Sequence, residues 1–403
     1  MHWKFILIIA MVMQSSLLCA QGCPEPKQLD DILGCLKTNH YLVQLKDFDV
    51  QNSSNLEKAM GQRPNPVLDV QTVHAGNARQ TQIILAQELD LGGRLTALRE
   101  QGRIIHTVNK VQKSITQEEI VETVLLNIHH LIHLNETLRV NNEVFGSLDS
   151  VIKVLRKRPV LNPEQEASLL NFNLQLAEVR NLIALLEDDE EEVLLFFYLN
   201  GGYRKEQVLN VMKDHYHPIE LVDSPDTSSL NLERLSLETK LAKEEWELQK
   251  ANAWSGLSIG PMFMDDKMEN ISEKLYGLAL NMPIPIWQTN GANKVRTQVA
   301  FSNSQKQFDL FRRKESIEKD TLTDRIAKLK ENLAKLPKAS ELTSSHKRVE
   351  KLYSQGLISS TIYLDSHRIW RDVSASKLEL EEKILRLTIG YYRLIGKLNE
   401  VHL

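Results

Sequence analysis

The sequence has few aromatic residues and few cysteines, and it has no long apolar run beyond its first 20 residues. Aromatic side chains make up 6% of the 403 residues, whereas charged side chains make up 25%. No later stretch reaches the roughly 20 consecutive apolar residues that a membrane-spanning helix needs. The formal net charge of -4 comes from interleaved acids and bases, so it provides no basic surface for nucleic acid. This balance is typical of long, solvated helices with a heptad pattern.

Catalytic motifs are missing as well. The sequence contains no glycine-rich phosphate loop, no nucleophile elbow and no zinc-protease pattern, so it predicts no enzyme active site and no cofactor. His129 and His133 are one helical turn apart, a spacing that metal sites use, but no Glu or Cys completes a ligand set. We therefore interpret this pair as structural or solvent-facing and predict no metal site.

The N-terminus has the layout of a secretory signal peptide over residues 1–20. Lys4 precedes an apolar run over residues 5–13, and Ala20 closes a small-residue exit. Two interpretations of the next cysteine remain open. Cys23 and Cys35 can close a short disulfide loop in an oxidising compartment, or Cys23 can carry a lipid anchor, because the residues before it resemble an imperfect lipobox.

The chain repeats one plan of elements twice. We predict a first structural repeat over residues 21–215 and a second over residues 216–403, each with helices, a β-hairpin and a long helical hairpin. The expected hairpins are 67–91, with strands 67–74 and 80–91, and 255–286, with strands 255–264 and 274–286. Proline and glycine clusters over residues 200–229 mark the boundary.

Apolar periodicity predicts the long helices. The expected helical segments are 26–60 as one or two helices, 95–157, 164–199, 230–252, 291–335, and a stretch from Pro337 to the end of the chain. Leu131, Leu138 and Ile152 lie on one heptad seam. Near the C-terminus two seams run side by side, one through Ile384 and one through Leu385, and this indicates a helix held between two neighbours.

Several motifs, in this order along the chain, give a family resemblance. They are Arg63-Pro64-Asn65-Pro66 before the first strand, residues 85–94 after the first hairpin, residues 280–286 with Asn290-Gly291, and residues 353–359 ahead of Tyr363-Leu364-Asp365. With these motifs the chain resembles the TolC family of outer-membrane efflux proteins, and within it the CzcC-like branch.

The resemblance implies a fold and a function. The fold is mainly α with a small β part: long antiparallel helices form a periplasmic α-barrel, and each of three chains gives four strands to a shared 12-stranded β-barrel. The function is a passive duct that carries small molecules or metal cations to the exterior. Its partners are two further copies, a periplasmic adaptor protein, an inner-membrane pump of the RND type and outer-membrane lipid.

The resemblance also places two candidate sites. The helix breaks at 158–163 and 354–360 lie at the periplasmic tip, where Gly356, Leu357, Ile358 and Ser359 match the adaptor-docking turn of the family. The first break has Arg158-Pro159 where the family pattern has glycine.

Asp365 matches an acid of the periplasmic gate, but Ile362 stands where the gate has a second acid. A cation-selective gate and a solvated helix position are both open for Asp365.

Two other functions remain as alternatives. One is an exit duct for type I protein secretion, which uses the same fold. The other is a periplasmic coiled-coil adaptor or scaffold without a barrel, which the paired hairpins disfavour.

Overall fold

The computed structural model describes residues 23–90, 92–212, 219–221, 228–252, 256–268, 271–282 and 289–402. The expected signal peptide over residues 1–20 lies outside these residues, and so do the ends of the second expected hairpin at 255 and 283–286. Within the described ranges, no helix has the length and apolar character to cross a membrane.

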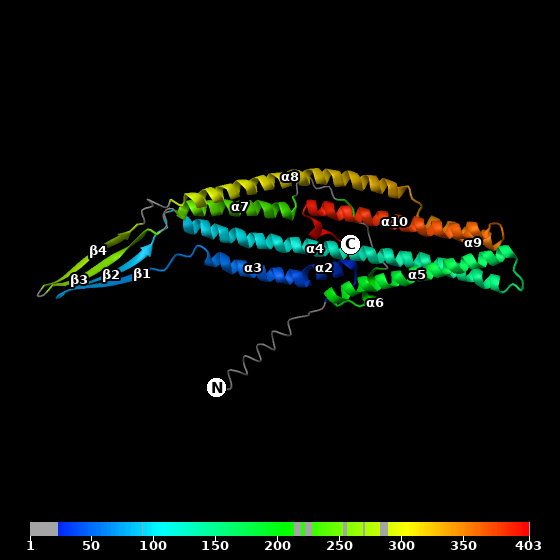
Figure 1. The fold of residues 1–403 in the computed structure, drawn as a ribbon, viewed down its shortest axis with the longest axis horizontal. Helices are drawn as coiled ribbons and strands as arrows, with labels where there is room; N and C mark the ends of the chain where they lie inside the picture. The colour runs from blue at the N-terminus through cyan, green and yellow to red at the C-terminus, as the bar shows by residue number, and fades with distance from the viewer. Residues whose placement is uncertain are drawn as a thin grey trace, which may run out of the picture. The chain divides into compact units, whose positions relative to one another are not determined.

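The described elements alternate between long helices and two β-hairpins (Figure 1). The helices are α2 (Leu29–Asn39), α3 (Tyr41–Ala59), α4 (Arg94–Arg156), α5 (Pro163–Gly201), α6 (Lys205–Met212), α7 (Leu230–Ala251), α8 (Gly291–Ala334), α9 (Ala339–Ser354), α10 (Ser360–Leu394) and the 3-10 helix η2 (Leu398–Glu400). The strands are β1 (Val67–Ala75), β2 (Ala78–Glu88), β3 (Ser258–Met268) and β4 (Ile271–Asn281).

The chain forms two compact units. The first consists of Met1–Gln44, Thr116–Thr227 and Ile317–Leu403, and the second consists of Leu45–Ile115 and Ser228–Ser316. Each unit takes segments from both halves of the sequence.

The second unit holds a four-stranded antiparallel sheet with the order β1-β2-β3-β4. In Figure 1 the two hairpins lie side by side in this sheet. Gly76 and Asn77 form the turn of the first hairpin, and Gly76 has a φ of 60°, which glycine adopts without strain. The strand expected to reach residue 91 ends at Glu88, because Asp90 accepts the backbone N–H groups of Arg94 and Leu95 at 2.8 and 2.9 Å and caps α4.

The second hairpin is longer toward its tip than expected. The sequence predicts a loop over residues 265–273, but β3 continues to Met268 and β4 begins at Ile271. The charged residues there suit a strand, because Asp265 lies directly opposite Lys274 on the same face of the sheet.

The two faces of the sheet differ in composition. Successive side chains of a strand point to opposite faces, so the register assigns each residue to a face. The first face, called the apolar face below, carries Leu68 and Val70 of β1, Ile83 and Leu85 of β2, Ile259, Pro261 and Phe263 of β3, and Tyr276, Leu278 and Leu280 of β4.

The opposite face is mixed: it carries glutamines, methionines, acids and small residues, and also apolar residues such as Val67, Ile84 and Leu275. Gln80 and Gln82 donate from their side-chain amides to the Sδ atoms of Met264 and Met262 at 2.9 and 2.8 Å. Gly260 and Gly277 lie on this face too. The sheet is therefore amphipathic.

The first unit has two apolar cores. One joins α2, α4, α5, α6, α8 and α10, and the other joins α4, α5, α9 and α10. Leu131 and Ile152 of the predicted α4 seam are buried, and Leu138 is half-buried. Ile384 and Leu385 are both buried, so both predicted seams of α10 are covered.

Two differences from the predicted helices concern short elements. The expected helix to the end of the chain stops at Leu394, because Gly396 adopts a φ of 65° and Leu398 is buried from a 3-10 turn. Helix α6 lies in the segment expected to be irregular, and it forms because Val208 and Val211 bury their side chains in the first core.

Candidate functional site

Two turns that are far apart in sequence line one cavity of about 1100 Å³ in the first unit. Arg158 and Asn162 come from the turn between α4 and α5. Gly356, Leu357 and Ser359 come from the turn between α9 and α10. The structure thus brings together the two predicted tip turns.

Gly356 ends α9 in a geometry that requires glycine. Its φ is 73°, its N–H donates to the carbonyl oxygen of Tyr353 at 2.9 Å, and the N–H of Leu357 donates to that of Leu352 at 3.0 Å. This pair of bonds is the Schellman arrangement, in which the left-handed residue satisfies the last carbonyl groups of a helix. A side chain at Gly356 would meet no atom within 4 Å, so the constraint is on the backbone alone.

The other three residues of the predicted docking turn have different environments. Ser359 caps α10 by accepting the N–H of Ile362 at 3.4 Å. Ile358 packs against the second core, whereas Leu357 is 67% exposed. Among Gly356, Leu357, Ile358 and Ser359, therefore, the large apolar side chain that a partner could contact belongs to Leu357.

The first turn reaches a stable form without glycine. Asn162 accepts the N–H of Gln165 at 2.8 Å, and the Gln165 side chain accepts the N–H of Asn162 at 3.2 Å, which together form a capping box. Pro163 stands at the first helical position, where its missing N–H costs no bond. This cap fixes the start of α5 after the break at Arg158-Pro159.

A polar network that sequence reasoning missed lines the same cavity. The Ser147 hydroxyl on α4 donates to the carboxylate of Glu350 on α9 and lies 2.6 Å from the Tyr363 hydroxyl on α10. Burial raises the pKa of Tyr363 to about 12, so its hydroxyl is protonated at neutral pH. These residues come from three helices, and no local pattern links them.

Two buried histidines lie beside this network. The His346 ring stacks on Trp370 at 3.9 Å between centroids, and the His367 ring meets His346 at 4.6 Å. Burial is the main cause that lowers the pKa of His367 to about 3, and the nearby His346 and Arg371 add to it. Both rings are therefore neutral parts of the packing near pH 7.

Asp365, the candidate gate residue, lies on the exposed side of α10. Its carboxylate is 3.3 Å from the guanidinium of Arg368, and both side chains are more than half exposed. This geometry suits a solvated helix position and also suits an acid that faces a wet channel.

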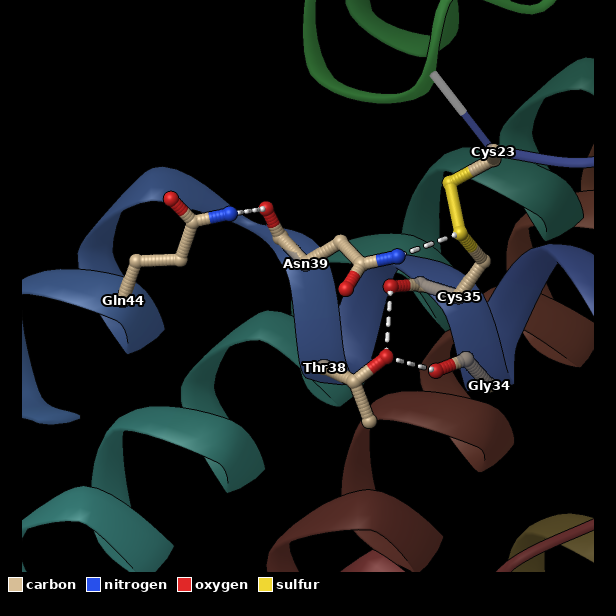
Figure 2. Close-up of a disulfide and its surroundings, with 6 residues drawn as sticks. All are labelled: Cys23, Gly34, Cys35, Thr38, Asn39 and Gln44. Atoms are coloured by element: carbon tan, nitrogen blue, oxygen red, sulfur yellow. Dashed lines mark hydrogen bonds between the residues drawn. A yellow bond between two sulfur atoms is a disulfide. The ribbon is translucent and has the colours of Figure 1, made fainter. Parts of the chain in front are cut away.

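Cys23 and Cys35 are joined in a disulfide (Figure 2). The side-chain amide of Asn39 donates to Cys35 Sγ at 3.2 Å, and the N–H of Cys23 donates to the carbonyl oxygen of Gly201 at 3.1 Å. The bond ties the N-terminal arm to α2, and the contact with Gly201 ties it to the end of α5. The alternative, a lipid anchor on Cys23, stays a prediction.

The histidines of α4 divide into two environments. His129 is buried, and burial is the main cause that lowers its pKa to about 4. His130 and His133 lie next to Glu382 of α10, and the potential ligand atoms of these three residues are all within 4.8 Å of one another. The acid that lies close to these histidines therefore comes from another helix, and their spacing in the sequence could not indicate it.

Comparison with known proteins places the fold. No family model and no curated protein matches the sequence. The outer-membrane channel OprN aligns with a TM-score of 0.72 and 12% identity, covering 92% of this chain and 90% of that chain. CusC, in a study of transmembrane channel formation, aligns at 0.67 and 14%, covering 93% and 94%.

The CmeC outer-membrane channel of Campylobacter jejuni aligns with a TM-score of 0.65 and 8% identity, covering 94% of this chain and 89% of that chain. The predicted fold class, mainly α with four antiparallel strands, is confirmed. The CzcC-like branch stays a prediction. From the fold of its described residues and these alignments, the chain has the TolC-like fold of outer-membrane channel proteins.

Proposed function

We propose that this chain is the outer-membrane channel component of a tripartite efflux system. Three copies form a passive duct that carries small molecules or metal cations from the periplasm, or from an inner-membrane pump, to the exterior. The observation that carries this proposal is the amphipathic four-stranded sheet with two open edges.

The apolar face suits contact with lipid. Tyr276, Leu278 and Leu280 of β4 are 80%, 76% and 67% exposed, and such a continuous exposed apolar surface is rare on proteins that meet only water. Toward the hairpin tips the same face becomes polar, with Arg79 and Lys267 opposite each other. An apolar band bordered by polar residues is the pattern of a strand surface in a bilayer.

The open edges call for further copies of the chain. Among the described strands, β1 and β4 each pair with one neighbour, so each leaves a row of backbone groups unpaired, which lipid does not tolerate. Three copies give twelve strands that close the sheet. Each hairpin comes from one half of the chain, 21–215 or 216–403, and we take these halves as structural repeats.

An exposed stripe on α5 supports an assembly of copies in the helical part. At 100° per residue, five exposed leucines fall within an arc of about 80°. They are Leu170, Leu174, Leu185, Leu195 and Leu199. We propose that this stripe, called the α5 stripe below, packs against a neighbouring copy.

The cavity at the two turns is the proposed docking site for a periplasmic adaptor. Leu357 offers an exposed apolar side chain at its rim, and Arg158 offers a charge from the other turn. The adaptor would connect the duct to an inner-membrane pump of the RND type. Outer-membrane location follows from the same proposal.

Conductance across a planar lipid bilayer tests the duct and its gate. We expect the purified wild-type protein to conduct without an energy source. Asp365→Asn removes one charge per chain and is expected to lower the preference for cations, with Asp320→Asn on α8 as an exposed control. Absence of any conductance contradicts the duct, and an unchanged current-voltage curve in Asp365→Asn assigns that residue to the solvated helix surface.

A further inference from the structure

We propose that His130, His133 and Glu382 form a binding site for a divalent transition-metal ion of the zinc type, bridging α4 and α10. The potential ligand atoms of the three side chains lie within 4.8 Å of one another. The proposal concerns the folded chain and does not depend on the proposed channel function.

The helices present these side chains in a geometry that favours a shared ligand. His130 and His133 are three positions apart on α4, so their side chains leave the same side of the helix. In a tetrahedral zinc site the ligand atoms are about 3.3 Å apart, given bonds of about 2.0–2.1 Å. The ligand atoms therefore have to approach one another by up to about 1.5 Å, a movement that side-chain rotation can supply.

The scaffold of the site is rigid. Leu131 and Leu134 on α4 are buried in the first core, and so are Ile384 and Leu385 on α10. Residues on either side of the site are thus fixed between the two helices. A binding site on packed helices keeps its ligands closer to the binding geometry than a site on a loop does.

The chemistry of the three groups suits a borderline cation. Imidazole nitrogens and a carboxylate oxygen are zinc ligands, and three protein ligands leave a fourth position for water or for a passing group.

Arg386 holds the carboxylate in position. Its guanidinium donates to Glu382 Oε1, with N–O distances of 2.6 and 2.8 Å. A hydrogen-bond partner of this kind orients a metal-binding carboxylate, although its positive charge opposes the cation. Because Arg386 is mostly exposed, solvent screens that repulsion.

Metal binding to the detergent-solubilised full-length protein tests the proposal. We expect one Zn²⁺ per chain by competition with a chromophoric chelator at pH 7.5. His130→Ala and Glu382→Gln are each expected to weaken the affinity at least about tenfold, as losses in metal sites usually do. His402→Ala is the matched control. His402 is exposed and lies 3.7 Å from Asp30, and that pair contains no second histidine.

A Co²⁺ spectrum adds a readout of geometry. We expect the visible bands of a four-coordinate ion with the wild-type protein and their loss in His130→Ala. The proposal would be overturned if the His130→Ala/Glu382→Gln double variant bound Zn²⁺ as tightly as the wild type. A Co²⁺ spectrum of the aqueous ion with the wild-type protein would also overturn it. Both substituted residues lie outside the buried core, so the variants are expected to fold, with helical circular dichroism as the check.

Discussion

The four residues of the proposed docking turn have different roles: some shape the backbone, and one offers a side chain that a partner could contact. Gly356 supplies a left-handed backbone and Ser359 supplies a helix cap, whereas Leu357 exposes its side chain. The motif predicted as a unit therefore contains two structural positions. Replacing Gly356 or Ser359 is therefore expected to change the direction of the Leu357 side chain rather than to remove a direct contact with a partner.

Gly356→Val tests the importance of this turn. The left-handed conformation costs a residue with a Cβ atom about 1–2 kcal/mol, and more for a β-branched one, so the turn is expected to rearrange. We expect loss of efflux in a strain that carries the variant, with an unchanged amount of trimer. Gly34→Val is the control, because Gly34 lies in the helix α2 with open space around it. Full efflux in the Gly356→Val strain would place docking at another turn.

His367 gives a pH dependence with a definite sign. Its pKa is about 3 in the folded chain against an ordinary value of 6.5, so between these values the unfolded chain binds more protons. The contribution of His367 to the free energy of unfolding is complete above pH 6.5. It decreases as the pH falls toward 3, by at most about 1.4 kcal/mol per pH unit. Denaturant unfolding at pH 4.5 and 7.5 measures it, with His367→Leu for comparison.

The wild type is expected to lose more stability than His367→Leu between the two pH values. Equal losses would show that His367 does not govern this part of the pH dependence. Comparison of the two proteins is needed because Glu118 acts in the opposite direction: burial raises its pKa to about 7, so it favours the folded chain at lower pH.

The pairing of distant residues could not be predicted from sequence. Glu382 lies on α10 and meets His130 and His133 of α4 only through helix packing. Glu350 reaches Ser147 in the same way. A local motif search finds partners within a helical turn or two, and these contacts cross between helices.

At the scale of elements, periodicity predicted the long helices to within one or two residues. α4 and α8 begin and end next to the expected positions, because long heptad patterns leave little choice of structure. Errors occurred where one side chain decides a boundary. Asp90 ends β2 early by capping α4, and Gly396 ends α10 before the chain does.

The second hairpin shows why charge misled the prediction. Charged residues at 265–267 look like a loop in the sequence, but β3 continues through them with Asp265 and Asp266 half-buried and Lys267 exposed. Asp265 opposite Lys274 adds a favourable cross-strand pair. Alternation alone could not reveal this, because consecutive charged residues give no alternation of apolar and polar positions.

At the scale of the whole molecule, the architecture could be predicted because short motifs occur in family order along most of the chain. The TolC-like fold is confirmed at 14% identity or less, where overall similarity of sequence carries little weight. The assembly is a different matter. Closure of the sheet would be a property of several chains, and the structure of one chain indicates it only through open strand edges and the α5 stripe.

The measurement that tests the central claim most directly is chemical cross-linking in native membranes, followed by fractionation. We predict that the wild-type protein is in the outer-membrane fraction as a trimer that separates on heating. Leu174→Glu with Leu185→Glu places charges on the α5 stripe and is expected to reduce the trimer, whereas Leu185→Met retains it. Recovery of the wild type only as monomers or dimers, or outside the outer membrane, would contradict the account.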